Sequence, residues 1–445
     1  MLLDEFQQMT LQECMQRQGC PLCRAVWRMD AARFSWYVND GVLDEETRRN
    51  VVRAVGFCSP HALYLSLIEG NGFLWSHLGT CMVYIDVLRQ ALLPELERFL
   101  TRSNSWLLHP FKLQVFFPLR HLFHHDLCLL CFDHRHHEAI YQEQFAKAFS
   151  NNTGFRQTYL QADSLCLPHF QQVRSSLSEE SVVRMLDVAQ FHALKQCEQT
   201  AAPMVQDQLR QTLCLLYGAE AILWSDFILR AALSPSQVGP PPCLVCQEHE
   251  HEMDQISTTL LDRLEEVSQY GEEGDHEGLF LCSWHAWEVL KQSSLQPAVI
   301  SRLERMLCRT CEAGLKDMRK MKLEPGVCQL CSWRSEQERV HVGTLKSQLA
   351  NPEQQVQLCL SHAWALLRQS PEEATAQHVA LALLHSGALL GKRLEAYVYK
   401  CTERFQDQMQ PDELVAWFDA IRWFGGSETA QFLLTSSPAR DTEGE

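Results

Sequence analysis

The chain of 445 residues lacks an apolar run of the roughly 18 residues that a membrane-spanning helix requires. Its N-terminus, MLLDEFQQMT, lacks the basic start and long apolar stretch of a signal peptide. Basic residues are also scarce, because 39 Lys and Arg stand against 55 Asp and Glu, which gives a net charge of −16. Lys and Arg are the residues that attract nucleic acid and anionic lipid. These absences predict a cytoplasmic protein that neither binds nucleic acid nor inserts into a membrane.

Strand patterns and catalytic signatures are rare as well. The sequence has no Gly-rich phosphate loop and no G-x-S-x-G nucleophile elbow. The best strand candidate, residues 113–119 (LQVFFPL), contains Pro118, which disfavours a strand. Apolar residues recur instead at helical spacing, for example Leu78, Met82 and Ile85. The sequence therefore predicts an all-α protein without an evident catalytic centre.

Cysteine is abundant, with 19 residues in a chain that shows no export signal. In a reducing compartment this abundance indicates metal binding rather than disulfides. Most of these cysteines belong to four repeats, each with a C-x2-C motif followed by a C-x2-H motif. The first Cys and the His of a repeat are 41, 41, 42 and 34 residues apart in repeats 1 to 4. The motif pairs are Cys20-Cys23 with Cys58-His61, Cys128-Cys131 with Cys166-His169, Cys243-Cys246 with Cys282-His285, and Cys328-Cys331 with Cys359-His362.

Three cysteines and one histidine form a typical ligand set for zinc, which favours four thiolate or imidazole ligands in a tetrahedron. Four protein ligands leave no open position for water, so such a site is structural rather than catalytic. An iron–sulfur cluster is the alternative, but the repeated C-x2-H motif favours zinc. The spacing predicts about four zinc ions per chain, each bound by the four ligands of a single repeat.

Local sequence places the ligand pairs at helix N-termini. Pro60 and Pro168 stand between the Cys and the His of their motifs, and proline suits the first turn of a helix. Ser283 and Ser361 are the small polar residues in the other two C-x2-H motifs. The positive end of the helix dipole favours thiolate over thiol. Each zinc ion is therefore expected to hold two helix starts together.

Short loop-forming segments predict that the chain is divided into four tandem helical modules. Residues 103–105 separate the first two, the Pro-rich residues 234–242 form the strongest linker, and residues 322–326 precede the last. The predicted organisation is modules at residues 1–105, 106–233, 243–324 and 325–434, the linker at 234–242, and a disordered tail at 435–445.

The sequence motifs of the first repeat resemble those of a known family. Its Cys20-Pro-Leu-Cys23 and Gly56-Phe57-Cys58-Ser-Pro-His61 motifs resemble an uncharacterised bacterial family with CPxC and GFCxxH signatures. The resemblance implies a helical zinc-binding protein with a domain of unknown function. It extends over all four repeats, although the second has Ser164-Leu165 in place of Gly-Phe and the fourth is shortened.

Other candidates for functional residues lie outside these zinc-ligand motifs. Cys308 and Cys311 form a fifth C-x2-C motif without a C-x2-H partner, so a redox dithiol and a buried helix face both remain open. Histidines crowd the segment 121–138, which makes it the one place for a metal-dependent enzyme site, although a polar approach to the zinc ligands explains them better. These are His121, His124, His125, His134, His136 and His137, with Glu138.

Two classes of function fit these patterns better than an enzyme does. The first is a zinc-stabilised helical scaffold that binds another protein. The second is a thiol–zinc switch or holdase, which releases metal on oxidation. The cysteine count alone does not separate the two.

Overall fold

A computed structural model shows that the described part of the chain is helical and contains no strand. The all-α prediction is confirmed there, and no helix in this part is long and apolar enough to cross a membrane. The predicted linker, the predicted tail and the strand candidate at 113–119 lie outside the described residues. The structure describes residues 2–58, 61–62, 65–66, 68–69, 77–103, 128–199, 212, 215–216, 243, 245–247, 329–349, 356–369, 372–403 and 408–425.

The chain divides into two compact units, each built from separate stretches of sequence. Unit 1 comprises Met1–Ala31, His134–Asp226 and Gln255–Ser335. Unit 2 comprises Ala32–Asp133, Phe227–Asp254 and Glu336–Glu445. Neither unit corresponds to a single predicted module, because each takes residues from both halves of the sequence.

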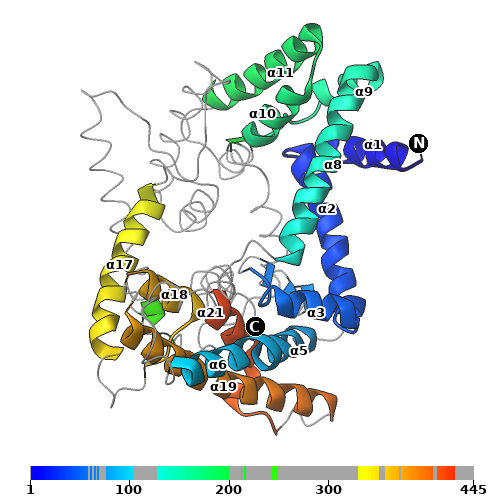
Figure 1. Cartoon of the computed structure of the whole chain (residues 1–445). Coiled ribbons are helices and arrows are strands. Elements are labelled where there is room, and N and C mark those ends of the chain that lie inside the picture. Colours follow the sequence, from blue (N-terminus) through cyan, green and yellow to red (C-terminus); the bar gives the residue numbers. More distant parts are fainter. Residues whose placement is uncertain are drawn as a thin grey trace, which may run out of the picture. The chain divides into compact units, whose positions relative to one another are not determined.

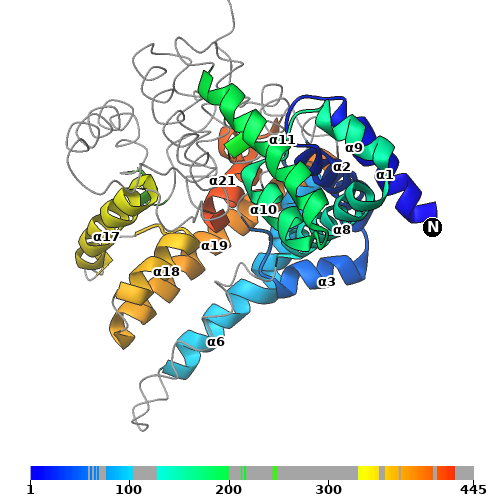
Figure 2. The same ribbon diagram turned by 90° about the horizontal axis from the view of Figure 1, so that it is seen from above.

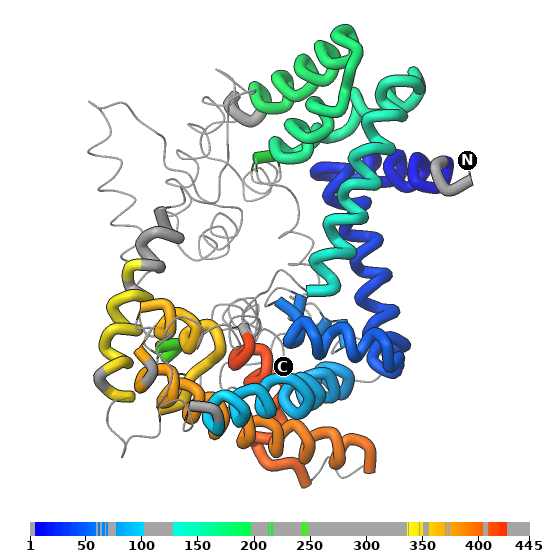
Figure 3. Tube along the Cα trace, viewed as in Figure 1, coloured from blue at the N-terminus to red at the C-terminus, as the bar shows by residue number. Residues whose placement is uncertain are grey.

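Unit 1 is organised around an aromatic core. Phe145 and Phe149 in α8 (Leu129–Asn151) pack against Phe155 and Tyr159 in α9 (Thr153–Leu160), with edge-on ring contacts of 5.2–5.4 Å. The same core includes buried residues of α1 (Leu2–Met15), of α2 (Pro21–Trp36) and of α10 (Leu167–Ser176). Helix α1 lies against α9 (Figure 2), and α10 is followed by α11 (Glu180–Gln199) (Figure 3).

Helices α2 and α8 lie side by side and run antiparallel (Figures 1 and 2). In unit 1, the buried carboxylate of Asp30 near the end of α2 accepts hydrogen bonds from His134 and His137 near the start of α8, at 2.5 and 2.8 Å. In unit 2, Arg33 forms a 2.7 Å ion pair with Asp133. These pairs fix the antiparallel register: the start of each helix lies toward the end of the other.

Unit 2 contains the end of α2, the start of α8 and a second group of helices around a long one. After α2, the π-helical turn η1 (Tyr37–Gly41) leads to α3 (Glu45–Arg53). Helix α19 (Glu373–Thr402) packs along α5 (Leu78–Asp86), η2 (Val87–Leu92) and α6 (Leu93–Ser103) (Figure 1). Unit 2 also contains α18 (Leu360–Gln369), α20 (Pro411–Leu414), α21 (Ala416–Gly425) and, from Glu336 onward, α17 (Gln329–Leu349).

Glycine allows the close approach of α19 to its neighbours. A Cβ atom at Gly387 would lie only 3.1 Å from Cδ2 of Leu93 and 3.4 Å from the ring of Trp423. The indole N–H of Trp423, in α21, donates a 3.2 Å hydrogen bond to the buried hydroxyl of Ser386 in α19. This part of unit 2 is therefore held by tight helix contacts.

Candidate metal centres

Each described ligand motif begins a helical turn. The carbonyl oxygen of the first Cys accepts a backbone hydrogen bond from the residue four positions later, at 2.8–3.2 Å, in all six motifs whose first residue is described. This is the arrangement of a helix N-cap, and it places the second ligand within the first turn. The predicted position of these ligand pairs at helix N-termini is thus confirmed for the motifs that begin at Cys20, Cys58, Cys128, Cys166, Cys243 and Cys359.

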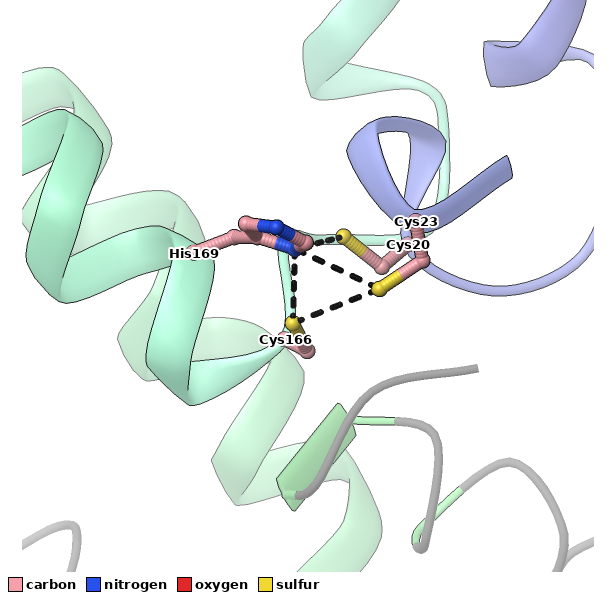
Figure 4. Close-up of side chains that lie close together, drawn as sticks. All are labelled: Cys20, Cys23, Cys166 and His169. Atoms are coloured by element: carbon pink, nitrogen blue, oxygen red, sulfur yellow. Dashed lines mark hydrogen bonds between the residues drawn. The ribbon is translucent and has the colours of Figure 1, made fainter. Parts of the chain in front are cut away.

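Site 1, in unit 1, consists of Cys20, Cys23, Cys166 and His169. Nδ1 of His169 faces the three sulfur atoms, at 3.5, 3.3 and 3.1 Å from Cys20, Cys23 and Cys166 respectively (Figure 4). Cys20 and Cys166 are each 1% exposed and His169 is 7% exposed. The four side chains thus converge on one enclosed point.

Two further quartets lie in unit 2. In site 2 (Cys58, His61, Cys128, Cys131), Nδ1 of His61 lies 3.1–3.5 Å from the three sulfur atoms. In site 3 (Cys243, Cys246, Cys359, His362), Nδ1 of His362 lies 3.2–3.4 Å from the three sulfur atoms. All four ligands of site 3 are buried, whereas three of the four in site 2 are partly exposed.

The predicted pairing within single repeats is wrong for these three sites. Site 1 joins the C-x2-C motif of repeat 1 to the C-x2-H motif of repeat 2, and site 2 joins the other two motifs of the same repeats. Site 3 likewise joins the C-x2-C motif of repeat 3 to the C-x2-H motif of repeat 4. Among the remaining predicted ligands, Cys282, His285 and Cys328 lie outside the described residues, as does the side chain of Cys331.

The antiparallel helices explain the exchange between repeats 1 and 2. Cys20 and Cys23 lie at the start of α2, beside the end of α8, from which the chain continues through α9 to Cys166. In unit 1, Leu22 at the start of α2 shares a hydrophobic core with Phe149 near the end of α8. Each C-x2-C motif is therefore close to the C-x2-H motif that follows the other helix.

A sharp turn brings Cys58 into site 2. After α3, Val55 and Gly56 both adopt the left-handed conformation, with φ of 58° and 95°. Glycine enters this region without strain, whereas a β-branched residue there is unusual. Phe57 then packs edge-on against Tyr37 with ring centres 5.0 Å apart. The Gly-Phe-Cys sequence thus supplies a turn, an anchor and a ligand in succession.

The ligand geometry fits a tetrahedral metal ion. With metal–sulfur and metal–nitrogen bonds of about 2.3 and 2.1 Å, the ligand atoms of such an ion are about 3.6–3.8 Å apart. In each site one pair of sulfur atoms lies 3.4–3.8 Å apart, and Nδ1 of the histidine lies 3.1–3.5 Å from the three sulfur atoms. These distances are close to those around a tetrahedral ion, and the donor atoms are those that zinc prefers.

The sites also favour charged ligands. Burial acts to raise the pKa of Cys20, but its contacts with Cys166, Cys23 and His169 lower that pKa well below the ordinary value. In site 2, burial disfavours a charged ring, but contacts with Cys128 and Cys131 raise the pKa of His61 to about 9. Each site thus combines a readily formed thiolate with a strong attraction for positive charge, which a divalent cation would satisfy.

Two carboxylates lie beside the ligand histidines: sequence reasoning missed Glu338 and gave Glu138 a different role, in a second metal site. Nε2 of His169 lies 3.1 Å from Oε1 of Glu138, and Nε2 of His362 lies 3.9 Å from Oε1 of Glu338. Both glutamates stand seven residues after the second Cys of a C-x2-C motif. This common offset is the signal in the sequence that could have identified them.

The other residues predicted as functional candidates either have a different role or lie outside the described part of the chain. His134 and His137 bind Asp30, and Glu138 binds His169, so these three side chains hold the helices together. Cys14 and Cys81 are buried outside the three quartets. The residues that fall outside the described part of the chain are His121, His124, His125, Cys308 and Cys311.

Comparison with known proteins supports a domain in the first half of the chain. Residues 4–211 match a family of unknown function (DUF6062), and this range contains sites 1 and 2 completely. No curated protein and no solved structure matches the chain.

Proposed function

We propose that this chain is a zinc-stabilised helical protein in which structural Cys3His sites close the fold. The observation that carries the proposal is the convergence of three quartets, with each imidazole Nδ1 within 3.5 Å of three sulfur atoms. Four protein ligands per ion leave no place for substrate or water. The metals would therefore serve to hold helix starts together rather than to catalyse a reaction.

A fourth zinc site completes the proposal. Site 3 takes one motif from repeat 3 and one from repeat 4, which leaves Cys282 and His285 to pair with Cys328 and Cys331. Helix α17 begins at Gln329, directly after Cys328, as α8 begins directly after Cys128. The second half of the chain would thus repeat the exchange of motifs that occurs in the first half.

Metal content tests this proposal. Purified protein should contain close to four zinc ions per chain by elemental analysis, and removal of all zinc with a chelator should reduce its helicity. A content near three with intact sites 1 to 3 would contradict the fourth site. Iron with visible absorption, or a content near zero, would contradict zinc altogether.

The proposed task is to present a helical surface to another protein. Support comes from the absence of an open metal position in the three described quartets and from the net charge of −16, which disfavours nucleic acid as a partner. The test is isolation of a specific protein that binds the zinc-loaded chain with defined stoichiometry. Binding that survives complete zinc removal and unfolding would contradict a role for the folded surface.

Site 2 favours a second candidate, a redox-sensitive switch. The sulfur atoms of Cys58 and Cys131 are 3.4 Å apart and partly exposed. Hydrogen peroxide would oxidise the two thiolates to one disulfide. The two electrons that they release, with two protons from solvent, reduce the peroxide to two water molecules, and zinc leaves the site. Release of one zinc equivalent by mild peroxide, together with a Cys58–Cys131 disulfide found by mass spectrometry, would support this candidate. Zinc retention would exclude it.

A further inference from the structure

A glutamate at the same position of two repeats lies beside the outer nitrogen of a ligand histidine. In site 1, Oε1 of Glu138 lies 3.1 Å from Nε2 of His169, whose Nδ1 faces the sulfur atoms. The two nitrogen atoms of this ring therefore have separate partners: one meets the ligand cluster and the other meets a carboxylate from α8.

In site 3 a glutamate from a distant stretch of chain lies near the same ring nitrogen, although beyond hydrogen-bond distance. Oε1 of Glu338, in α17, lies 3.9 Å from Nε2 of His362, whose Nδ1 again faces the sulfur atoms. Glu138 and Glu338 each follow a second motif cysteine, Cys131 and Cys331, by seven residues. Seven residues are two helical turns, so both glutamates lie on the same face of their helix as that cysteine.

Glu138 therefore lies on the same helix as a ligand of a second site. Helix α8 contributes Cys131 to site 2 through its first turn and Glu138 to the histidine of site 1 two turns later. The corresponding residue of repeat 1, Asp30, instead binds His134 and His137. Among the described residues, a glutamate beside a ligand histidine is thus a feature of repeats 2 and 4.

From these contacts we infer that Glu138 and Glu338 are positioning residues for the metal-binding histidines His169 and His362. The inference rests on the proposed zinc-binding function. A carboxylate that accepts a hydrogen bond from Nε2–H holds the imidazole in the tautomer whose Nδ1 can bind a metal, and it increases the basicity of that nitrogen. Loss of such an outer carboxylate typically weakens metal binding 10–100-fold.

The test is chelator competition with zinc-loaded full-length protein. Glu138→Ala should weaken the binding of one zinc equivalent per chain by about 10–100-fold, and Glu338→Ala should do the same for a different equivalent. Glu138→Gln, which keeps an acceptor oxygen but loses the charge, should lie between wild type and Glu138→Ala. The matched controls are Glu143→Ala, at an exposed position of α8, and Glu336→Ala, whose carboxylate binds Arg339 on α17.

A spectroscopic measurement separates positioning from general stability. In the zinc-loaded wild type, nitrogen NMR should show His169 protonated at Nε2, and this proton should exchange faster with water in Glu138→Ala at unchanged helicity. Equal zinc affinity in Glu138→Ala and Glu143→Ala would overturn the inference while leaving the zinc sites intact. Absence of bound zinc in the wild type would overturn the proposed function itself.

Discussion

The sulfur atom of Cys20 lies 3.5 Å from Nδ1 of His169, although 149 residues separate the two in sequence. The nearer histidine of the same repeat, His61, belongs to a different quartet. Repeats 1 and 2 therefore exchange their ligand motifs, and each site fastens one repeat to the other. Loss of either metal should consequently affect both repeats rather than a single module.

Substitution of a ligand cysteine should differ sharply from substitution of a core cysteine. Cys166→Ala should remove one zinc and with it a large part of the stability of unit 1, because structural zinc contributes about 10–16 kcal/mol of apparent binding free energy. Cys14→Ala, which alters the same core without touching a ligand, should keep every zinc and cost about 1 kcal/mol. Elemental analysis and urea unfolding of both variants check this prediction. Equal zinc contents in the two variants would contradict it.

The metal ligands could be predicted from the sequence because the features that identify them involve only a few neighbouring residues. A helix N-cap is set by a few neighbouring residues, and Pro168 between Cys166 and His169 marks such a start directly. The spacing of two residues within each motif also lets both side chains of one turn approach the same ion. These features required no knowledge of how distant helices pack.

The pairing of the motifs was not predictable in this way. Closure of a short loop costs less entropy than closure of a long one, which favours ligands from the same repeat. However, α2 has 16 residues and α8 has 23, so they extend about 24 and 34 Å and carry the chain away from the cysteines at their starts. The antiparallel packing of these two helices, which is fixed by pairs such as Arg33 with Asp133, decides which motifs share a metal site.

The buried carboxylate of Glu69 should be essential for the start of α5. It accepts hydrogen bonds from the backbone N–H groups of Gly79 and Thr80 and from the hydroxyl of Thr80, at the N-terminal turn of that helix. Glu69→Ala would leave two buried N–H groups without this acceptor, at about 1–3 kcal/mol each. Urea unfolding should show a loss of at least about 2 kcal/mol at unchanged zinc content. A loss below about 0.5 kcal/mol would show that other groups cap α5.

His77 should make stability depend on pH. Its ring stacks on Trp417 with centres 3.5 Å apart, and burial lowers the pKa of His77 to about 3. In the unfolded chain the pKa is about 6.5, so the unfolded state binds a proton first as the pH falls. The contribution of neutral His77 is therefore fully present above pH 6.5 and is lost progressively as the pH falls toward 3.

The measurement compares wild type with His77→Phe in zinc-saturated buffer, so that the metal ligands are common to both. Between about pH 7.5 and 5.5, the wild type should lose about 1.4 kcal/mol more unfolding free energy than the variant. NMR should also show no titration of the His77 ring over this range. Parallel pH profiles for the two proteins would contradict the buried neutral state.

The exchange of motifs between repeats 1 and 2 is tested most directly by counting zinc in double variants. Cys20 and His169 belong to one site, so Cys20→Ala and His169→Ala should each lose one zinc, and the double variant should still lose only one. Cys20 and Cys58 belong to different sites, so the Cys20→Ala, Cys58→Ala double variant should lose two. Loss of two zinc ions from the first double variant and of one from the second would contradict the exchange.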